Sequence, residues 1–373
     1  MTTADTISVT APADFHVHLR QGALSELVTS HVRLGGFTLA YVMPNLQPPI
    51  KNTEEALLYK AQLQAIDPTV EYLMTLYLSP DLTPDEIRKA KHAGVVGKIG
   101  RLSVGPVQAD NIASTGVKSY PRGVTTNSDG GIESYETYYP IFRAMEEEDM
   151  VLNLHGEVPS APSDPSSNIC VLNAEPSFLP HLIKLHAAFP KLRIVLEHAT
   201  TRAAVECVKS LGDTVACTIT AHHLALTVDD WAGQSWNFCK PVAKFPDDRQ
   251  ALRDVIKEGH PRFFLGSDSA PHPPTKKSTS TPSQPCAAGV YTSPILLPLV
   301  AHLLESFGAL DKLENFTSGF GRAFYQRPSN SARQTKLRRI SGRVVEAKWT
   351  KGTEEVVPFW AGKEIGWEIV EDE

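Results

Sequence analysis

The sequence lacks the features that would place it in a membrane or on a nucleic acid. It contains no run of about 18 apolar residues, so we expect no membrane span. It contains no long basic run and its formal net charge is −6, so we expect no nucleic acid as its main partner. The polar residues 1–10 offer no apolar core for a signal peptide.

Cysteine is scarce as well. The five cysteines are an odd number, lie far apart and include no Cys-x-x-Cys pair. This pattern argues against a disulfide framework and against a thiolate zinc site, and it favours a reducing, cytoplasmic location. The remaining composition, 42% hydrophobic and 21% charged residues, is that of an ordinary globular protein.

One stretch near the start, residues 14–20, reads Asp-Phe-His-Val-His-Leu-Arg and predicts a short buried strand. Because side chains alternate across a strand, His16 and His18 would face the same side, with their Cα atoms about 6.6–6.8 Å apart. Two imidazoles at that separation can close on one metal ion, whereas the alternative is a strand with two hydrogen-bonded core histidines. Arg20 would emerge on the same side, near the end of the strand.

Short apolar runs alternate with helix signals along most of the chain. The runs at 37–43 and 72–78 are each followed by a capping residue and, three residues later, a glutamate. An irregular region offers either 94–99 or 116–120 as a further strand. Eight parallel strands with intervening helices predict an α/β fold, the (β/α)8 TIM barrel, with its active site at the carboxyl ends of the strands. Four more runs complete the count: 150–154, 193–197, 214–220 and 262–267.

We expect residues 1–373 to form one domain. Residues 99–115 read as an insertion of unassigned role, and 123–131 read as a polar, glycine-rich surface loop. A helix is expected at 310–324. The segment at 342–373 alternates polar and apolar residues, and we expect it to cover the barrel without forming a second domain.

Polar residues stand where several apolar runs end. His155 and His198 each close a run, Asp268 follows another, and Lys118 lies near the end of the candidate strand at 116–120. An unpaired buried carboxylate is costly, and coordination to a cation would remove that cost. Imidazoles with a carboxylate suit zinc or a similar metal. Six other histidines are assigned to ordinary core or surface positions: His31, His92, His181, His186, His260 and His302.

With these residues in view, the sequence resembles the dihydroorotases of the amidohydrolase superfamily, in the form found as a separate enzyme in many bacteria and in fungi. The resemblance extends from about residue 14 to residue 367. It rests on seven motifs: Asp-Phe-His-Val-His-Leu-Arg at 14–20, Val-Met-Pro-Asn-Leu-Gln-Pro-Pro at 42–49, Lys-Ser-Tyr-Pro at 118–121, Leu-His-Gly-Glu-Val at 154–158, Glu-His-Ala-Thr-Thr at 197–201, Gly-Ser-Asp-Ser-Ala-Pro-His at 266–272 and Val-Pro-Phe-Trp-Ala-Gly at 357–362.

The resemblance implies a zinc enzyme that interconverts N-carbamoyl-L-aspartate and L-dihydroorotate in de novo pyrimidine synthesis. One zinc ion would be held by His16, His18 and Asp268. A second would be held by His155 and His198. Bridging hydroxide would attack the ring amide, and the aspartate would act as general base and then as general acid.

A carbamylated lysine, N6-carboxylysine, would bridge the two zinc ions. Lys118 matches this position through its Lys-Ser-Tyr-Pro context, and Lys98 is the rival because it ends another plausible strand. Burial and nearby cations favour the neutral amine that takes up carbon dioxide. The residues before Lys118 depart from the family pattern and leave the insertion unplaced.

The resemblance also assigns substrate contacts. Arg20 would pair bidentately with the substrate carboxylate, and Asn45 and His272 match positions that bind the same group. Backbone groups at Lys240 and Ala288 would contact the pyrimidine ring, although a lysine stands where an apolar residue is expected.

Thr125 and Thr126 match a mobile loop that closes over the substrate, and the alternative for them is a solvated turn. His223 matches a family histidine to which we assign no role. Related enzymes are commonly homodimers, so we expect a homodimer here.

Two other functions stay open. The first is another cyclic amidohydrolase acting on hydantoins, dihydropyrimidines or allantoin, which would not need the carboxylate contacts. The second is a non-catalytic scaffold, which would not need the ligand set.

Overall fold

The described part of the chain contains a barrel and a C-terminal cover. None of the described helices combines the length and apolar character needed to cross a bilayer. Lys98, Thr125 and nearly all of the insertion expected at 99–115 lie outside the described residues. In this computed structural model, those residues are 5–93, 114–124, 126–128, 130–160, 166–278, 285–328 and 333–370.

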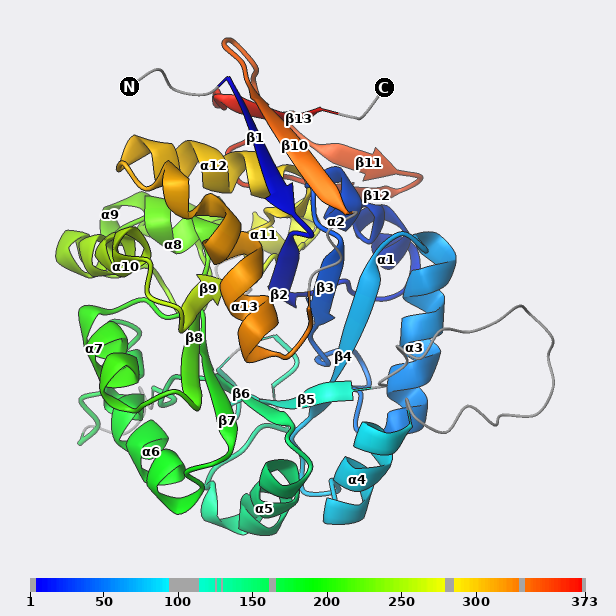
Figure 1. Ribbon diagram of the computed structural model, residues 1–373, viewed down its shortest axis with the longest axis vertical. Helices are drawn as coiled ribbons and strands as arrows, with labels where there is room; N and C mark the ends of the chain where they lie inside the picture. The colour runs from blue at the N-terminus through cyan, green and yellow to red at the C-terminus, as the bar shows by residue number, and fades with distance from the viewer. Residues whose placement is uncertain are drawn as a thin grey trace.

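Eight parallel strands form the centre of the molecule, and helices surround them (Figure 1). Each strand pairs with the next in chain order, from β2 to β9. A parallel bridge between Val17 and Ser269 brings the first strand back to the last, so the predicted TIM barrel is confirmed. The strands are β2 (Ala13–Val17), β3 (Leu39–Val42), β4 (Glu71–Tyr77), β5 (Ser114–Ser119), β6 (Val151–His155), β7 (Arg193–Glu197), β8 (Val215–Ile219) and β9 (Phe263–Leu265).

Local capping fixes where several of the outer helices begin. The side chains of Asn52 and Thr83 accept hydrogen bonds from backbone N–H groups three residues later, at the starts of α3 and α4. Thr201 does the same for α7. The helices are α1 (Gly22–Val28), α2 (Ser30–Leu34), α3 (Thr53–Ile66), α4 (Pro84–His92), α5 (Tyr139–Glu147), α6 (Ala174–Ala188), α7 (Arg202–Ser210), α8 (Ala221–Ala225), α9 (Val228–Trp231), α10 (Pro246–Glu258), α11 (Pro274–Lys277), α12 (Leu296–Ser306) and α13 (Phe320–Phe324).

Apolar and aromatic side chains fill the amino-terminal part of the barrel. The ring of Tyr325 stacks on Phe15 at 4.8 Å between centroids, and its hydroxyl donates to Asn153 Oδ1 at 2.6 Å. Residues near the strand starts complete this cluster, which is fully packed. The open, polar space is therefore left at the carboxyl ends of the strands.

The helix expected at 310–324 is divided. It consists of a 3₁₀ turn at Leu310–Lys312, a π-helical turn at Asn315–Gly319 and α13. A Cβ atom on Gly321 would lie 2.2 Å from the Phe15 ring, so this glycine lets α13 approach the barrel closely. The single-helix prediction is wrong because tertiary packing, which sequence periodicity does not contain, reshapes this segment.

The two ends of the described chain meet in one small sheet. In it, β10 (Gln334–Arg339) pairs on one side with β1 (Thr6–Thr10) and on the other with β13 (Trp367–Val370). This sheet lies beside α12 in Figure 1. A hairpin of β11 (Trp349–Lys351) and β12 (Glu354–Val356) packs against α1.

Candidate functional site

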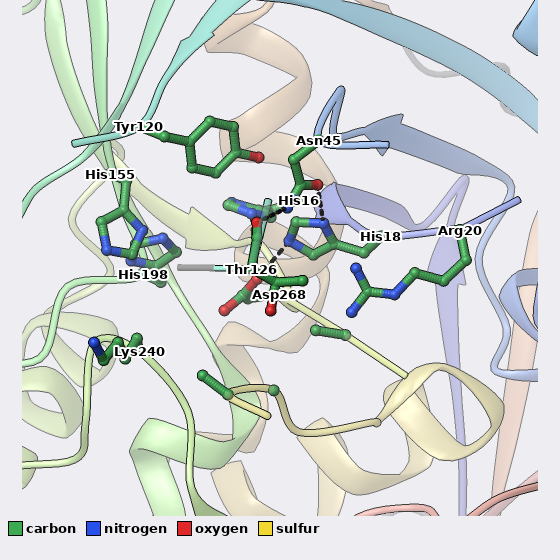
Figure 2. A pocket seen from close by; sticks show the side chains of 13 residues that line it. His16, His18, Arg20, Asn45, Tyr120, Thr126, His155, His198, Lys240 and Asp268 are labelled. Carbon is green, nitrogen blue, oxygen red and sulfur yellow. Dashed lines mark hydrogen bonds and ion pairs between the residues drawn. The ribbon is translucent and has the colours of Figure 1, made fainter. Parts of the chain in front are cut away.

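A pocket opens at the carboxyl ends of the barrel strands, and Figure 2 shows the side chains that line it. Most of the residues that the sequence singled out lie here, together with Tyr120, Ala270 and Gly289. The singled-out residues in the lining are His16, His18, Arg20, Asn45, Thr126, His155, His198, Lys240, Asp268 and Ala288.

His16, His18 and Asp268 form the first group of ligand atoms. The Nε2 atoms of the two histidines lie 3.3 and 3.0 Å from the same carboxylate oxygen, Asp268 Oδ1. One donor atom from each residue lies within 4.8 Å of the others, all three residues are buried, and the group can hold a metal ion. Asp268 has a φ of +45°, a conformation that non-glycine residues seldom adopt and that often marks functional sites.

The strand that carries these histidines is less regular than expected. Its register with β3 shifts between Asp14 and Val17, and the strand ends at Val17, before His18. Simple alternation therefore does not explain why His16 and His18 meet. Two backbone hydrogen bonds hold this segment beside the one that carries Asp268. Asp268 N donates to His16 O at 2.8 Å, and His18 N donates to Ser269 O at 3.1 Å.

The outer nitrogens of both histidines are anchored. His16 Nδ1 lies 2.8 Å from Glu197 Oε2, and Thr218 Oγ1 donates to the same oxygen at 2.5 Å. His18 Nδ1 lies 2.8 Å from Asn45 Oδ1. Such partners fix the ring orientation and the tautomer of a metal-binding histidine, and they turn its other nitrogen toward the metal.

His155 and His198 form a second group beside the first. Their ring centroids are 4.6 Å apart, and the His198 ring is 5.2 Å from that of His16. His155 Nε2 lies 2.7 Å from Glu157 Oε2, so its Nδ1 is the nitrogen left for a ligand. His198 Nδ1 is buried and has no hydrogen-bond partner among the described residues. An unpaired buried nitrogen is costly, and metal coordination would remove that cost.

Lys118 lies on β5, fully buried, with no hydrogen-bond partner for Nζ among the described residues. Burial lowers the pKa of its ammonium to about 8, although the carboxylates of Glu197 and Asp268 oppose the shift. A neutral amine is thus accessible near neutral pH. Neutral amines add carbon dioxide to give a carbamate, an anionic group with two ligand oxygens.

The charges of the site also suit a metal. Burial lowers the pKa of His18 to about 4 and that of His198 well below its ordinary value, so both imidazoles are neutral and keep a lone pair. Burial alone would raise the pKa of Asp268, but the neighbouring His16 and His18 hold it well below its usual range. The site thus offers neutral imidazoles and an ionised carboxylate, which together suit a divalent cation.

Arg20 follows the end of the strand in a left-handed conformation, with a φ of +57°, and still reaches the pocket. Its Nε donates to Pro271 O at 2.9 Å, and its Nη2 lies 3.2 Å from His272 Nε2. The same His272 nitrogen lies 3.0 Å from Ala288 O. No ion pair between Arg20 and a carboxylate is found in the part of the chain that the structure describes, although Asp268 stabilises the guanidinium charge electrostatically from across the pocket.

Asn45 has contacts beyond its bond to His18. Its Nδ2 donates to Thr126 O at 3.1 Å, and Asn127 Nδ2 donates to Asn45 O at 2.9 Å. These bonds hold the described part of the polar loop against the pocket. The side-chain amide of Asn45 is thus engaged by protein groups, although Asn45 lines the pocket together with Lys240 and Ala288.

The carboxylate partners of the histidines were not among the residues predicted from the sequence. Glu197 and Glu157 stand inside the Glu-His and His-Gly-Glu motifs, one and two residues from His198 and His155. A carboxylate beside a metal-binding histidine is the signal that could have found them. This signal does not identify the histidine that the carboxylate contacts. Glu197 is hydrogen-bonded to His16, which lies on another strand, and not to its sequence neighbour His198.

Replacing Glu197 by glutamine should weaken metal binding and lower activity by roughly 10- to 100-fold, because His16 loses its charged partner. The check is the metal dissociation constant together with kcat/KM. Glu175→Gln is the control: this buried carboxylate binds Thr200 and Thr201, not a histidine. It should lower thermal stability and leave metal affinity unchanged. Equal metal affinity in Glu197→Gln and wild type would contradict the assignment.

Comparison with known proteins finds relatives that are named dihydroorotase. No family model matches the chain. It is 55% identical to a dihydroorotase of Mycosarcoma maydis over 98% of both chains. It is 43% identical to a dihydroorotase of Saccharomyces cerevisiae, over 95% of this chain and 96% of the other. It is 38% identical to a dihydroorotase of Marinomonas, over 97% and 99%.

Solved structures agree. A crystal structure of the Saccharomyces cerevisiae dihydroorotase in complex with 5-fluoroorotic acid superposes with a TM-score of 0.89 and 41% identity, covering 98% of this chain and 99% of that chain. An L-hydantoinase of Arthrobacter aurescens superposes with a TM-score of 0.73 at 17% identity, over 98% and 87%. At that identity the second likeness concerns the fold alone.

Proposed function

The chain belongs to the dihydroorotase family, and from this premise we infer how the residues at the barrel mouth carry out the reaction. The protein is a metal-dependent cyclic amide hydrolase that acts on a small molecule in pyrimidine biosynthesis. The observation that carries the assignment of roles is the meeting of five candidate ligands at one pocket: His16, His18, Asp268, His155 and His198. Lys118 does not line that pocket, but it is buried on β5 with no hydrogen-bond partner for Nζ among the described residues.

We propose two zinc ions at this pocket. The first would be held by His16, His18 and Asp268, and the second by His155 and His198. The unpartnered His198 Nδ1 and the close approach of both first-group imidazoles to one carboxylate oxygen fit this division. The bound ions would lower the pKa of a water molecule and polarise the amide carbonyl of the substrate.

Lys118 is proposed to bridge the two groups as N6-carboxylysine. Its buried, unpartnered Nζ and lowered pKa favour the neutral amine that reacts with carbon dioxide. The carboxylates of Glu197 and Asp268 influence the amine electrostatically, and the amine in turn influences His155 and His198, so it is near enough to both ligand groups to support the proposal. The carbamate would add a negative charge where two cations meet.

Asp268 is proposed as the proton carrier. Its pKa lies well below the usual range, so it is ionised and does not already carry the proton that it would take from the attacking water. It then delivers that proton to the ring nitrogen that leaves when dihydroorotate opens. In the reverse direction, it takes a proton from the carbamoyl nitrogen of N-carbamoyl-L-aspartate while the ring closes and water is lost.

Arg20 is proposed to bind the substrate carboxylate. Its guanidinium reaches the pocket while His272 and the Pro271 carbonyl hold it in place. A planar guanidinium pairs bidentately with a carboxylate and fixes the position of the scissile bond. We assign His272 and Asn45 to the same end of the substrate, and the backbone at Ala288 and Lys240 to its ring.

Arg20→Ala should lower kcat/KM for dihydroorotate by roughly 30-fold or more, because losing a charged hydrogen bond in a desolvated site costs about 2–5 kcal/mol. The metals should stay bound, since Arg20 is not a ligand. Arg20→Lys should recover little, because lysine offers a point charge and no planar fork.

The control substrate for this variant is dihydrouracil, which lacks the carboxylate. Any weak activity on dihydrouracil should be nearly the same in wild type and Arg20→Ala. An equal loss on both substrates would mean that Arg20 supports the fold or the metals and does not recognise the carboxylate. Preference of the wild type for dihydrouracil would favour a dihydropyrimidinase-like specificity.

Three further expectations remain proposals. We propose that the chain acts as one domain, with the segment from 342 onward packed on the barrel, and that the enzyme is a homodimer. The polar loop that includes Thr126 is proposed to close over the substrate, since its backbone is hydrogen-bonded to Asn45 at the pocket. Sedimentation of the purified protein at several concentrations tests the dimer.

A further inference from the structure

A second cluster of possible metal ligands shares no residue with the proposed zinc pair. His222 and His223 stand in the first turn of α8, after β8, and Cys239 comes from the segment that follows α9. All three side chains are buried, with exposures of 0, 2 and 1%. One donor atom from each lies within 4.8 Å of the others.

The distances within this cluster fit zinc. His223 Nε2 lies 3.6 Å from Cys239 Sγ. In a tetrahedral zinc site, bonds of about 2.1 Å to nitrogen and 2.3 Å to sulfur also put those two atoms about 3.6 Å apart. The carbonyl oxygen of Pro241 lies 3.0 Å from His223 Nε2 and 3.2 Å from Cys239 Sγ, so it can accept a hydrogen bond from either group without a metal. To act as a fourth donor it would have to move outward by a few tenths of an ångström, because tetrahedral geometry places an oxygen donor about 3.4 Å from the nitrogen and about 3.6 Å from the sulfur.

The second, independent observation is His222. Neither of its ring nitrogens has a hydrogen-bond partner in the part of the chain that the structure describes, although the residue is fully buried. Its ring centroid is 4.4 Å from that of His223. Leaving both nitrogens unpaired is costly, and coordination through one of them would reduce this cost.

A neighbouring hydroxyl group orients the ring of His223. Thr220 Oγ1 lies 2.8 Å from His223 Nδ1, and this bond fixes the ring as partners of metal-binding histidines do. Zinc binding would release the proton of the Cys239 thiol to solvent.

We propose that His222, His223 and Cys239 bind a structural zinc ion, with the Pro241 carbonyl oxygen as the fourth donor. The sequence argued against a thiolate site because no Cys-x-x-Cys pair occurs. The fold supplies this site from one cysteine and two adjacent histidines 16 and 17 residues earlier, a spacing that the usual zinc patterns do not include.

The zinc site would stabilise the backbone around Lys240, which borders the active-site pocket. Lys240 lies between Cys239 and Pro241 and borders the pocket. The preceding residue, Phe238, accepts hydrogen bonds at its carbonyl from Gly289 N at 3.0 Å and from Lys277 Nζ at 2.9 Å. Zinc would thus tie α8 to the backbone proposed to contact the substrate ring. This consequence rests on the proposed function, whereas the site itself does not.

Cobalt substitution tests the site directly. The protein is produced in cobalt-containing medium, so that the metal is present while the buried site folds. A thiolate bound to cobalt(II) gives a charge-transfer band in the near ultraviolet, and the proposed active-site ligands include no thiolate. Wild-type protein should show this band and bind three metal equivalents per chain. A wild-type protein with two equivalents and no band would overturn the proposal, whatever its activity.

The variants are Cys239→Ser and, as a matched control, Cys217→Ser. Cys217 is equally buried, and its Sγ donates to Thr218 O. Cys239→Ser should lose the band and one metal equivalent, retain the other two, and raise KM for dihydroorotate more than it lowers kcat. Cys217→Ser should keep the band. A band that survives in Cys239→Ser would assign the thiolate to another cysteine and overturn the site. If Cys239→Ser fails to fold, the wild-type spectrum and metal count still decide.

Discussion

Lys118→Ala should lose more activity than the roughly 10- to 100-fold that removal of a partner behind a metal ligand costs, because the proposed bridge itself disappears. A small carboxylic acid such as acetate should restore part of the activity, since its two oxygens can occupy the place of the carbamate. The measurement is kcat/KM for dihydroorotate with and without the added acid.

Lys60→Ala is the matched control for Lys118→Ala. Lys60 is also buried, and burial also lowers its pKa, but it lies on α3 outside the pocket. It should retain the metals and gain nothing from acetate. Lys98→Ala should also keep its metals. The opposite pattern, with Lys118→Ala active and Lys98→Ala rescued by acetate, would move the bridge to Lys98.

Asp268→Asn should lower kcat by at least about 100-fold, because the substitution keeps the shape of the side chain and removes the proposed proton acceptor. It also removes an anionic ligand from the first group. The measurement combines kcat in both directions with the metal content. The second group, His155 and His198, should keep its metal, so that loss of proton transfer can be distinguished from loss of the whole site.

Asp14→Asn is the control for a buried carboxylate at the same strands. Asp14 accepts hydrogen bonds from Ser267 N at 2.8 Å and Ser267 Oγ at 2.6 Å, and it has no proposed role in the reaction. It should lower thermal stability more than kcat. A kcat in Asp268→Asn close to that of wild type would remove Asp268 from the proton transfer.

Much of the barrel could be predicted because its strands are short apolar runs that end in polar residues. The choice between 94–99 and 116–120 was open in sequence, and β5 now includes Lys118 at its carboxyl end. Periodicity gave no hint that the first strand ends at Val17 or that the segment 310–324 divides, because a register shift and the packing of Gly321 decide these points.

The residues of the pocket could be predicted where each stands in its own local sequence motif. They were less predictable where the partner comes from a distant strand. His16 depends on Glu197, 181 residues away, and that pairing has no local pattern. The cluster around Cys239 shows the same difficulty, since its donors meet only after α8 and the later segment pack together.

The most direct test of the proposed metal centre is a crystal structure with anomalous scattering recorded at the zinc edge. We expect two zinc peaks at the barrel mouth, one among His16, His18 and Asp268 and one at His155 and His198, with density for a carbamate extending from Lys118 Nζ between them. A single peak at the mouth, or an unmodified Lys118 beside two peaks, would contradict the proposed metal centre.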